Sequence, residues 1–192
     1  MRAADWDQRY AEQRQWSAEP NALVAELLAG LPPGDAVDLG AGEGRHALWL
    51  AGRGWRVTAV DFSAVGLDRG RAQPGADRVT WITADVRTWS PPPATLDLVL
   101  VAYLHLPEPD VLALLTGTVG WLRPGGRLLL LGHDVENITS GIGGPQDPAI
   151  LYGVDRLAPV ARLLDVDRLE QVPRRTPEGT ALDTLLWGRR PG

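Results

Sequence analysis

One short stretch constrains the fold of this 192-residue chain more than any other. A mostly apolar run over residues 36–39 breaks into three glycines at alternate positions, Gly40, Gly42 and Gly44, and apolar residues at helical spacing follow over 47–51. This order predicts a strand, a glycine-rich turn and a helix. The glycines let the backbone turn sharply and let a ligand approach main-chain N–H groups at the start of the helix.

Strand and helix patterns then alternate along the chain. Further strands are expected at residues 56–61, 79–83, 96–101 and 127–131, and helices at 22–31, after Ser63 to about residue 72, from Pro109 onward and over 154–163. Connections of this length imply right-handed crossovers and a parallel sheet. The last two strands, near 167–172 and 181–187, are joined by a turn, and we expect this pair to be antiparallel. A turn is expected over Leu122–Gly126.

Composition narrows the classes of function. The length favours one domain over residues 1–192, and 44% hydrophobic and 22% charged residues are ordinary for a globular protein. With a net charge of −5 and no basic patch, nucleic acid is not an expected partner. There is no apolar run of membrane-spanning length and no signal peptide, so we expect a cytoplasmic protein with no membrane partner, a monomer or weak homodimer.

Two residue types are missing altogether. The chain has no cysteine, and all 19 of its basic residues are arginine. This excludes a thiolate nucleophile, a Schiff-base lysine and the Tyr-x-x-x-Lys pair of many dehydrogenases. Metal ligands other than carboxylates are scarce, and no metal site is expected.

Three features lie at the carboxyl ends of the first three expected strands. The glycine turn follows the first strand, Asp61 ends the second and Asp85 follows the third, while Asp38 lies within the first. Ligands of open α/β sheets bind outside the carboxyl ends of the strands, and a carboxylate can accept both hydroxyls of a ribose. The pattern indicates an adenosine-type ligand, although an aspartate after a strand also commonly caps a helix. The Gly-x-Gly-x-Gly spacing, with Arg45 in place of a third fingerprint glycine, disfavours NAD.

Five segments in order resemble the class I S-adenosylmethionine-dependent methyltransferases. They are Val37–Gly44, Val60–Ser63, Ala84–Val86, Leu96–Val99 and Leu122–Leu128. The resemblance implies an α/β, Rossmann-like three-layer sandwich whose seven-stranded sheet is mostly parallel with the last strand antiparallel. Trp6, Arg9-Tyr10 and Trp16 are similar to the opening of small-molecule enzymes of the thiopurine and tellurite-resistance type, which implies that residues 1–19 form a lid. The alternative is an amphipathic helix whose aromatic face simply docks on the core.

The resemblance also implies roles for individual residues. The methionine part of S-adenosylmethionine would lie against the backbone of Gly40, Ala41 and Gly42. Asp38 would orient that loop or the amino group of the cofactor. Asp61 would accept the ribose hydroxyls. The remaining cofactor contacts would come from Trp16, Arg45, Phe62, Asp85, Val86 and Tyr103, with Phe62, Asp85 and Val86 at the adenine and Arg45 at the carboxylate.

Methyl transfer by in-line displacement to a small-molecule S, N, O or Se acceptor is the expected reaction. The protein supplies mostly orientation, and a general base only if the acceptor must lose a proton. His105 is the first base candidate, with Tyr103 beside it; His133 and Asp134 are the next pair, and His46 a third. Residues 133–153 are expected to be a loop on the acceptor side, with Asn137, Gln146 and Tyr152 as polar candidates.

Two other functions remain open at this point. One is a non-catalytic module that binds S-adenosylmethionine or S-adenosylhomocysteine, because fold does not fix function. The other, less favoured by the glycine spacing, is an NAD-linked oxidoreductase.

Overall fold

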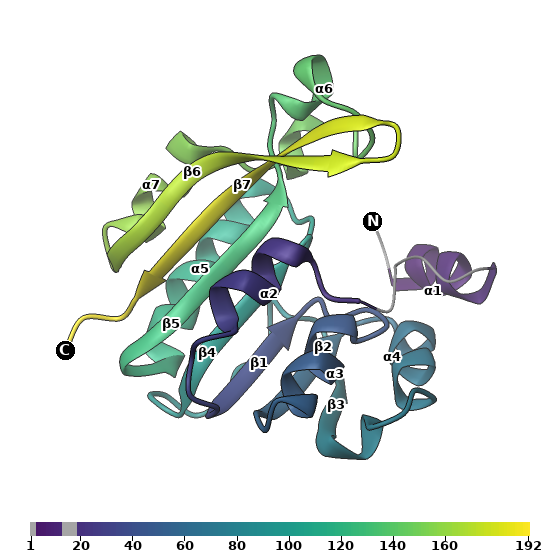
Figure 1. Cartoon of the computed structure of the whole chain (residues 1–192), viewed down its shortest axis with the longest axis vertical. Coiled ribbons are helices and arrows are strands. Elements are labelled where there is room, and N and C mark those ends of the chain that lie inside the picture. The colour runs from purple at the N-terminus through teal and green to yellow at the C-terminus, as the bar shows by residue number, and fades with distance from the viewer. Residues whose placement is uncertain (1–2, 13–18) are drawn as a thin grey trace. The chain divides into compact units, whose positions relative to one another are not determined.

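A computed structural model of the chain describes residues 3–12 and 19–192 (Figure 1). These residues form two compact units, which divide after Pro91. The order of helices and strands follows the expected alternation in both.

The first unit contains a parallel sheet of three strands. β1 (Asp35–Leu39) pairs with β2 (Arg56–Asp61), and β2 pairs with β3 (Val79–Thr83), which follows the short 3-10 helix η1 (Ala76–Arg78). α3 (Arg45–Gly52) packs on β1 and β2, and α4 (Ala64–Arg71) packs on β2 and β3. Two crossovers of this kind bring the ends of all three strands to one edge of the sheet.

Two helices precede this sheet. α1 (Ala3–Glu12) packs against α4, and its aromatic side chains Trp6 and Tyr10 stack with ring centroids 5.6 Å apart, as the four-residue spacing predicts. α2 (Ala22–Leu28) begins at Asn21, whose side chain accepts hydrogen bonds from two backbone N–H groups of the first turn. It ends three residues earlier than the expected Leu31, ahead of the two prolines.

The second unit contains four strands. β4 (Leu96–Ala102) runs parallel to β5 (Leu122–His133), while β7 (Gly179–Arg189) is antiparallel to both β5 and β6 (Asp165–Thr176). α5 (Glu108–Trp121) packs on β5, and α7 (Val154–Ala161) packs on β6 and β7 (Figure 1). The core strands of this unit are fully buried, with Leu98, Leu100 and Leu128–Leu130 at 0% exposure.

In the first unit the strand order is β3-β2-β1, and all three strands run parallel. In the second unit the order is β4-β5-β7-β6, and β7 runs against the other three strands. The expected mostly parallel α/β sheet with an antiparallel last strand is confirmed.

The structure corrects two local expectations. Residues 122–126 do not form a separate turn but open β5, because Gly125 and Gly126 exchange backbone hydrogen bonds with Arg190 beyond the end of β7. Residues 133–153 are not a featureless loop. They contain α6 (Asn137–Ser140), the 3-10 helix η2 (Pro148–Ile150) and a bridge between Asp134 and Tyr152.

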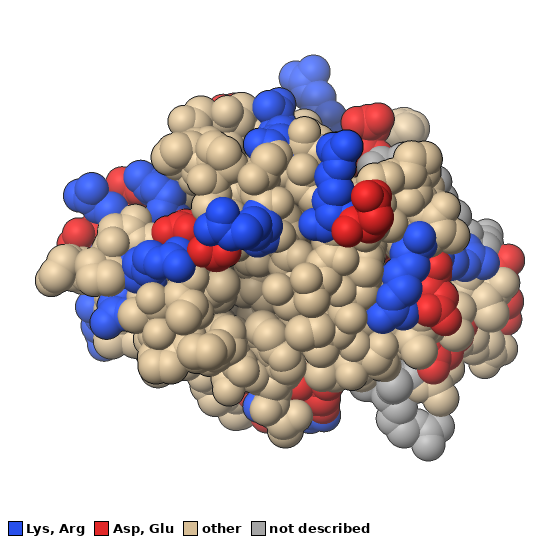
Figure 2. Space-filling view, turned by 90° about the horizontal axis from the view of Figure 1, so that it is seen from below, with Lys and Arg blue, Asp and Glu red and all other residues tan. Residues whose placement is uncertain are grey.

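Among the helices in residues 3–12 and 19–192, none has both the length and the hydropathy to cross a membrane. On the face drawn in Figure 2, arginine side chains lie beside acidic ones. Arginine–carboxylate ion pairs in the described residues include Arg56–Asp35, Arg123–Asp97 and Arg127–Asp167.

Candidate active site

The glycine-rich turn of the first unit is fastened to the end of β2. Gly40, Gly42 and Gly44 all have positive φ, of 73°, 56° and 73°. The N–H groups of Gly40 and Ala41 donate to the Val60 carbonyl at 2.8 and 3.1 Å, and Gly44 closes the turn onto Ala41. Because left-handed backbone is costly for other residues, the alternate glycines are what allow this turn to form.

Asp61 holds the turn through its side chain. Its carboxylate accepts from the N–H of Gly42 at 2.9 Å and from the N–H of Ser63 at 2.8 Å. Burial raises the pKa of this carboxyl, against the effect of the backbone donors. Each carboxylate oxygen has a second lone pair, so Asp61 can still accept from a ligand hydroxyl. The contact with Ser63 at the start of α4 is of the helix-capping kind that the sequence left open, whereas the bond to Gly42 was not predicted.

Asp38, in β1, carries a buried oxygen without a partner. The side chain is 1% exposed, and its Oδ2 has no hydrogen bond within the described part of the chain. Burial raises its pKa to about 7, although the charge of Arg45 and the N–H of Ala47 lower it. A buried acceptor left open in this way fits a cationic donor from a ligand.

The remaining predicted residues of the first unit lie around the same strand ends. Asp85 follows β3, is half-exposed and forms an ion pair with Arg87 at 2.6 Å, which lowers its pKa. Val86 is buried and Phe62 is partly exposed. Arg45 is the first residue of α3 and is partly exposed as well. Trp16 lies outside the described residues.

α1 contributes contacts that were not predicted. Tyr10 is 4% exposed, and its hydroxyl lies so close to Gly42 that a Cβ there would be 2.4 Å from it. The Asp7 carboxylate accepts from the Ser63 hydroxyl at 2.6 Å. α1 thus packs directly on the glycine turn and on the first residues of α4. The four-residue aromatic spacing indicated a packed face, but no sequence signal specified Gly42 as its partner.

His46, the third base candidate, forms a hydrogen bond within the fold. It is 4% exposed, and its Nε2 accepts from the N–H of Asn21 at 3.2 Å. Burial lowers its pKa to about 3, and the charge of Arg45 adds to this. The ring is therefore neutral at pH 7 and joins α3 to the start of α2.

The second unit brings three predicted residues together. The rings of His105 and His133 stack at 5.5 Å with 12° between their planes, and Tyr103 lies 5.1 Å from His133. Tyr103 has a positive φ of 59°, stabilised by its N–H bond to the Leu131 carbonyl at 2.7 Å. Burial, together with the charge of His133, lowers the pKa of His105 to about 4.

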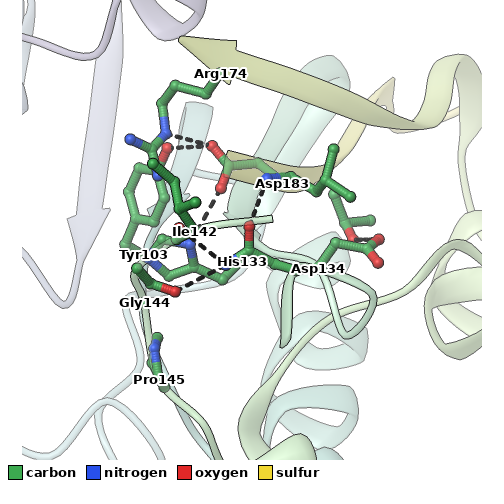
Figure 3. A network of polar contacts seen from close by, with 12 residues as sticks. Tyr103, His133, Asp134, Ile142, Gly144, Pro145, Arg174 and Asp183 are labelled. Atoms are coloured by element: carbon green, nitrogen blue, oxygen red, sulfur yellow. Dashed lines mark hydrogen bonds and ion pairs between the residues drawn. The ribbon is translucent and has the colours of Figure 1, made fainter. Parts of the chain in front are cut away.

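Asp183 and Arg174 complete this cluster, and neither was predicted. Figure 3 shows Tyr103, His133 and Arg174 directed at Asp183, which is 1% exposed. The Tyr103 hydroxyl and the Arg174 Nε donate to Asp183 Oδ2 at 2.6 and 2.7 Å. Burial would raise the pKa of Asp183, but the donors around it outweigh this and lower it. A lone carboxylate inside an otherwise apolar strand was the available signal.

The side chains of residues 134–152 mainly build the local fold. Asp134 accepts from the Thr184 hydroxyl at 2.6 Å and the Glu136 N–H at 2.9 Å. Asn137 accepts from the Leu182 N–H and donates to the Gly143 carbonyl. Tyr152 is buried and donates to the Leu104 carbonyl, and burial raises its pKa. Gln146 is exposed.

Comparison with known proteins decides the family. Residues 36–126 match a family described as a methyltransferase domain. Trans-aconitate 2-methyltransferase of Azoarcus sp. is 33% identical over 183 residues, covering 83% of this chain and 70% of that protein. The enzyme of the same name from Methylobacterium radiotolerans is 30% identical over 98% of this chain and 80% of its own length. The chain belongs to the class I S-adenosylmethionine-dependent methyltransferases. It is a methyltransferase enzyme, and its cofactor is S-adenosylmethionine.

Solved methyltransferase structures share the fold. TehB from Haemophilus influenzae is 14% identical with a TM-score of 0.76, covering 96% of this chain and 67% of that one. NodS from Bradyrhizobium japonicum is an N-methyltransferase solved in complex with S-adenosylhomocysteine. It is 17% identical with a TM-score of 0.72, covering 99% of this chain and 98% of that one. A methyltransferase of the expected tellurite-resistance type, TehB, is thus among the structures that share this fold.

The residues of the first unit fit this cofactor. The open Asp38 Oδ2 suits a ligand ammonium, and the glycine turn leaves backbone without side chains for close approach. Asp61 retains lone pairs for hydroxyls beside the N–H groups that it binds. The same side chains that shape the turn are therefore available to hold the cofactor.

Proposed function

We propose that this methyltransferase moves the methyl group of S-adenosylmethionine to an S, N, O or Se atom of a small molecule by in-line displacement. The main support for this proposal is the glycine turn. Its Gly42 N–H donates to Asp61, and Asp38, just before it in sequence, has a buried oxygen without a hydrogen bond in the described residues. The cofactor supplies a methyl group on a positively charged sulfur, which is a good leaving group.

The protein's own residues then mainly bind and orient. Asp38 and the backbone of Gly40–Gly42 hold the methionine part, Asp61 holds the ribose, and Phe62, Asp85 and Val86 hold the adenine. Arg45 faces the carboxylate, and residues 1–19, with Trp16, act as the lid. Fixing two reactants in this way lowers a barrier by roughly 7–11 kcal/mol.

The acceptor side is assigned to the second unit. Tyr103, His105 and His133 are the catalytic candidates, because Tyr103 and His133 lie against the buried Asp183 carboxylate and His105 stacks on His133. Residues 133–153 form the acceptor wall of a single functional domain. With a net charge of −5, the acceptor is a small molecule rather than nucleic acid, and the enzyme works in the cytoplasm as a monomer or weak homodimer.

A ligand titration with an acceptor panel tests this function. Thermal unfolding is followed with S-adenosylmethionine, S-adenosylhomocysteine and NAD, since a ligand that binds the native state stabilises it by about 2.7 kcal/mol at 100 times its Kd. The two sulfur ligands are expected to raise the unfolding temperature and NAD to leave it unchanged. Turnover is then measured on phenols, thiols, amines and trans-aconitate, the last suggested by the name of the two relatives.

Each outcome has a defined meaning. Stabilisation by NAD alone would support the oxidoreductase alternative, and no response to either sulfur ligand would contradict the proposal. Binding without turnover on any acceptor would favour the non-catalytic alternative.

A further inference from the structure

The strand register of the second unit places a histidine opposite a carboxylate. His133 is the last residue of β5, and its cross-strand partner on β7 is Asp183. Directly opposed residues of an antiparallel pair present their side chains on the same face. Arg174 lies on β6, two residues from Val172, the partner of Asp183 on that side, so it is on this face too.

The two oxygens of Asp183 are not equivalent. Oδ2 accepts from both the Tyr103 hydroxyl and the Arg174 Nε. Oδ1 has no hydrogen bond in residues 3–12 and 19–192, although it is buried. The Nδ1 of His133 lies 3.3 Å from it and is itself buried without a hydrogen bond there. At this separation the two atoms are each other's nearest candidate partners, and such bonds commonly tighten when a substrate binds.

This pairing decides where the proton of neutral His133 resides. An Nδ1–H directed at a carboxylate leaves Nε2 without a proton, which makes Nε2 the basic atom. Nε2 is not among the fully buried unpaired atoms of the described chain, in contrast to Nδ1. The backbone of Gly144 packs on the ring, where a Cβ would lie 3.1 Å away, and limits its rotation.

His105 is the weaker candidate for the base. Its Nε2 is buried without a hydrogen bond in the described residues, and its ring stacks on His133. Its pKa is lowered to about 4, so it takes up a proton poorly at neutral pH. Two stacked imidazoles are not both protonated easily, because like charges at this distance repel. Of the two rings, His133 is the one whose Nδ1 faces the Asp183 carboxylate.

We propose that His133 is the general base of the methyl transfer, that Asp183 is its positioning residue, and that the acceptor is a small molecule with a neutral hydroxyl nucleophile. In the step, the acceptor oxygen forms a bond to the methyl carbon as the sulfur–methyl bond breaks. The electron pair of that bond stays on sulfur, and the hydroxyl proton goes to His133 Nε2. This assignment rests on the proposed function and makes it more specific.

The charge balance of the cluster favours a neutral acceptor. The charge of Asp183 is matched by Arg174, and His105 is neutral at pH 7. The other titratable groups facing or flanking His133 are Tyr103 and Asp134, and Asp134 is held by Thr184. An ammonium or a carboxylate would find no unmatched opposite charge here, whereas a hydroxyl finds a base.

Nitrogen NMR of the imidazoles tests the positioning role without turnover. In the wild-type protein, His133 is expected as the Nδ1–H tautomer, and Asp183→Asn is expected to shift it toward Nε2–H. Asp134→Asn is the matched control, because it neutralises the neighbouring buried carboxylate and should leave the tautomer of His133 unchanged. An Nε2–H tautomer in the wild type would overturn the proposal even if no acceptor were found.

Kinetics with phenols of graded acidity test the base. At neutral pH, Asp183→Asn and His133→Gln are expected to slow methylation of weakly acidic phenols by roughly 10²–10⁴-fold. The loss should shrink for phenols that are already ionised, while S-adenosylhomocysteine affinity stays within about twofold. An equal loss for ionised and neutral phenols, or turnover of trans-aconitate but of no phenol, would overturn the hydroxyl assignment. Failure of the wild type to bind S-adenosylhomocysteine would instead contradict the proposed function.

Discussion

At the scale of single residues, Asp61 has two tasks that one substitution can separate. Its carboxylate fastens the glycine turn through Gly42 and is the proposed ribose acceptor. Asp61→Asn keeps one acceptor oxygen for the turn but loses the charge. We expect S-adenosylhomocysteine to bind more weakly by roughly 1.5–3 kcal/mol, the contribution of hydrogen bonds to charged groups, as measured by calorimetry.

Asp35→Asn is the matched control for this measurement. Asp35 is also a carboxylate of the parallel sheet, but it pairs with Arg56 at an exposed site. Its substitution should leave the affinity unchanged. Equal affinities for wild type and Asp61→Asn would mean that the ribose is held elsewhere.

The raised pKa of Asp38 predicts that cofactor binding is accompanied by release of a proton. Burial raises its pKa to about 7, so at about pH 6 the carboxyl is largely protonated in the free protein. A bound ammonium favours the ionised form, and binding should then release close to one proton. Calorimetry in buffers of different ionisation enthalpy measures this release, which should fade at about pH 8.5. Asp38→Asn should abolish it, and a wild-type protein that releases no proton at pH 6 would refute the ammonium contact.

At the scale of elements, the packing of α1 on the glycine turn is the contact to test. A Cβ at Gly42 would lie 2.4 Å from the Tyr10 hydroxyl, and the φ of 56° is itself unfavourable for alanine. Gly42→Ala should therefore displace Tyr10 and cost about 1–3 kcal/mol of unfolding free energy. Denaturant unfolding and proteolysis at Arg9 would report the loss of stability and of α1 packing.

A second substitution separates the clash from the backbone strain. Tyr10→Phe removes the hydroxyl, so in the double variant with Gly42→Ala part of the lost stability should return. Gly30→Ala is the control, since nothing in the described residues lies within 4 Å of a Cβ there. A double variant no more stable than Gly42→Ala would show that strain alone is responsible.

At the scale of the whole molecule, the sequence specified more of the fold than of the site. Alternating apolar runs and glycine breaks predicted every strand, because these patterns act locally. The start of β5 was not predicted, because residues 125–126 are held by bonds to Arg190, far away in sequence. Asp183 was missed for the same reason: its partners come from three other segments, and only the strand register brings them together.

The shifted pKa values of two buried groups, His46 and Asp38, predict how the stability of the first unit changes with pH. His46 has a pKa of about 3 in the folded protein against an ordinary value of 6.5, so between these pH values the unfolded chain binds the extra proton. This contribution makes stability rise with pH and is lost as pH falls below 6.5. Asp38 acts in the opposite sense, because its folded pKa of about 7 lies above its ordinary value of 3.8, and stability falls as pH rises across that window.

Two variants should therefore change the slope of unfolding free energy against pH in opposite directions. His46→Gln keeps an acceptor for the Asn21 N–H but does not titrate, and should lower the slope of unfolding free energy against pH by about 1.4 kcal/mol per unit between about pH 4 and 6. Asp38→Asn should raise the slope by a similar amount over the same range. Both residues lie before Pro91, so one denaturant transition reports both, and other groups cancel in comparison with the wild type. Slopes that change in the same direction would contradict this account, because opposite signs follow only if His46 is buried as the neutral ring and Asp38 as the protonated acid.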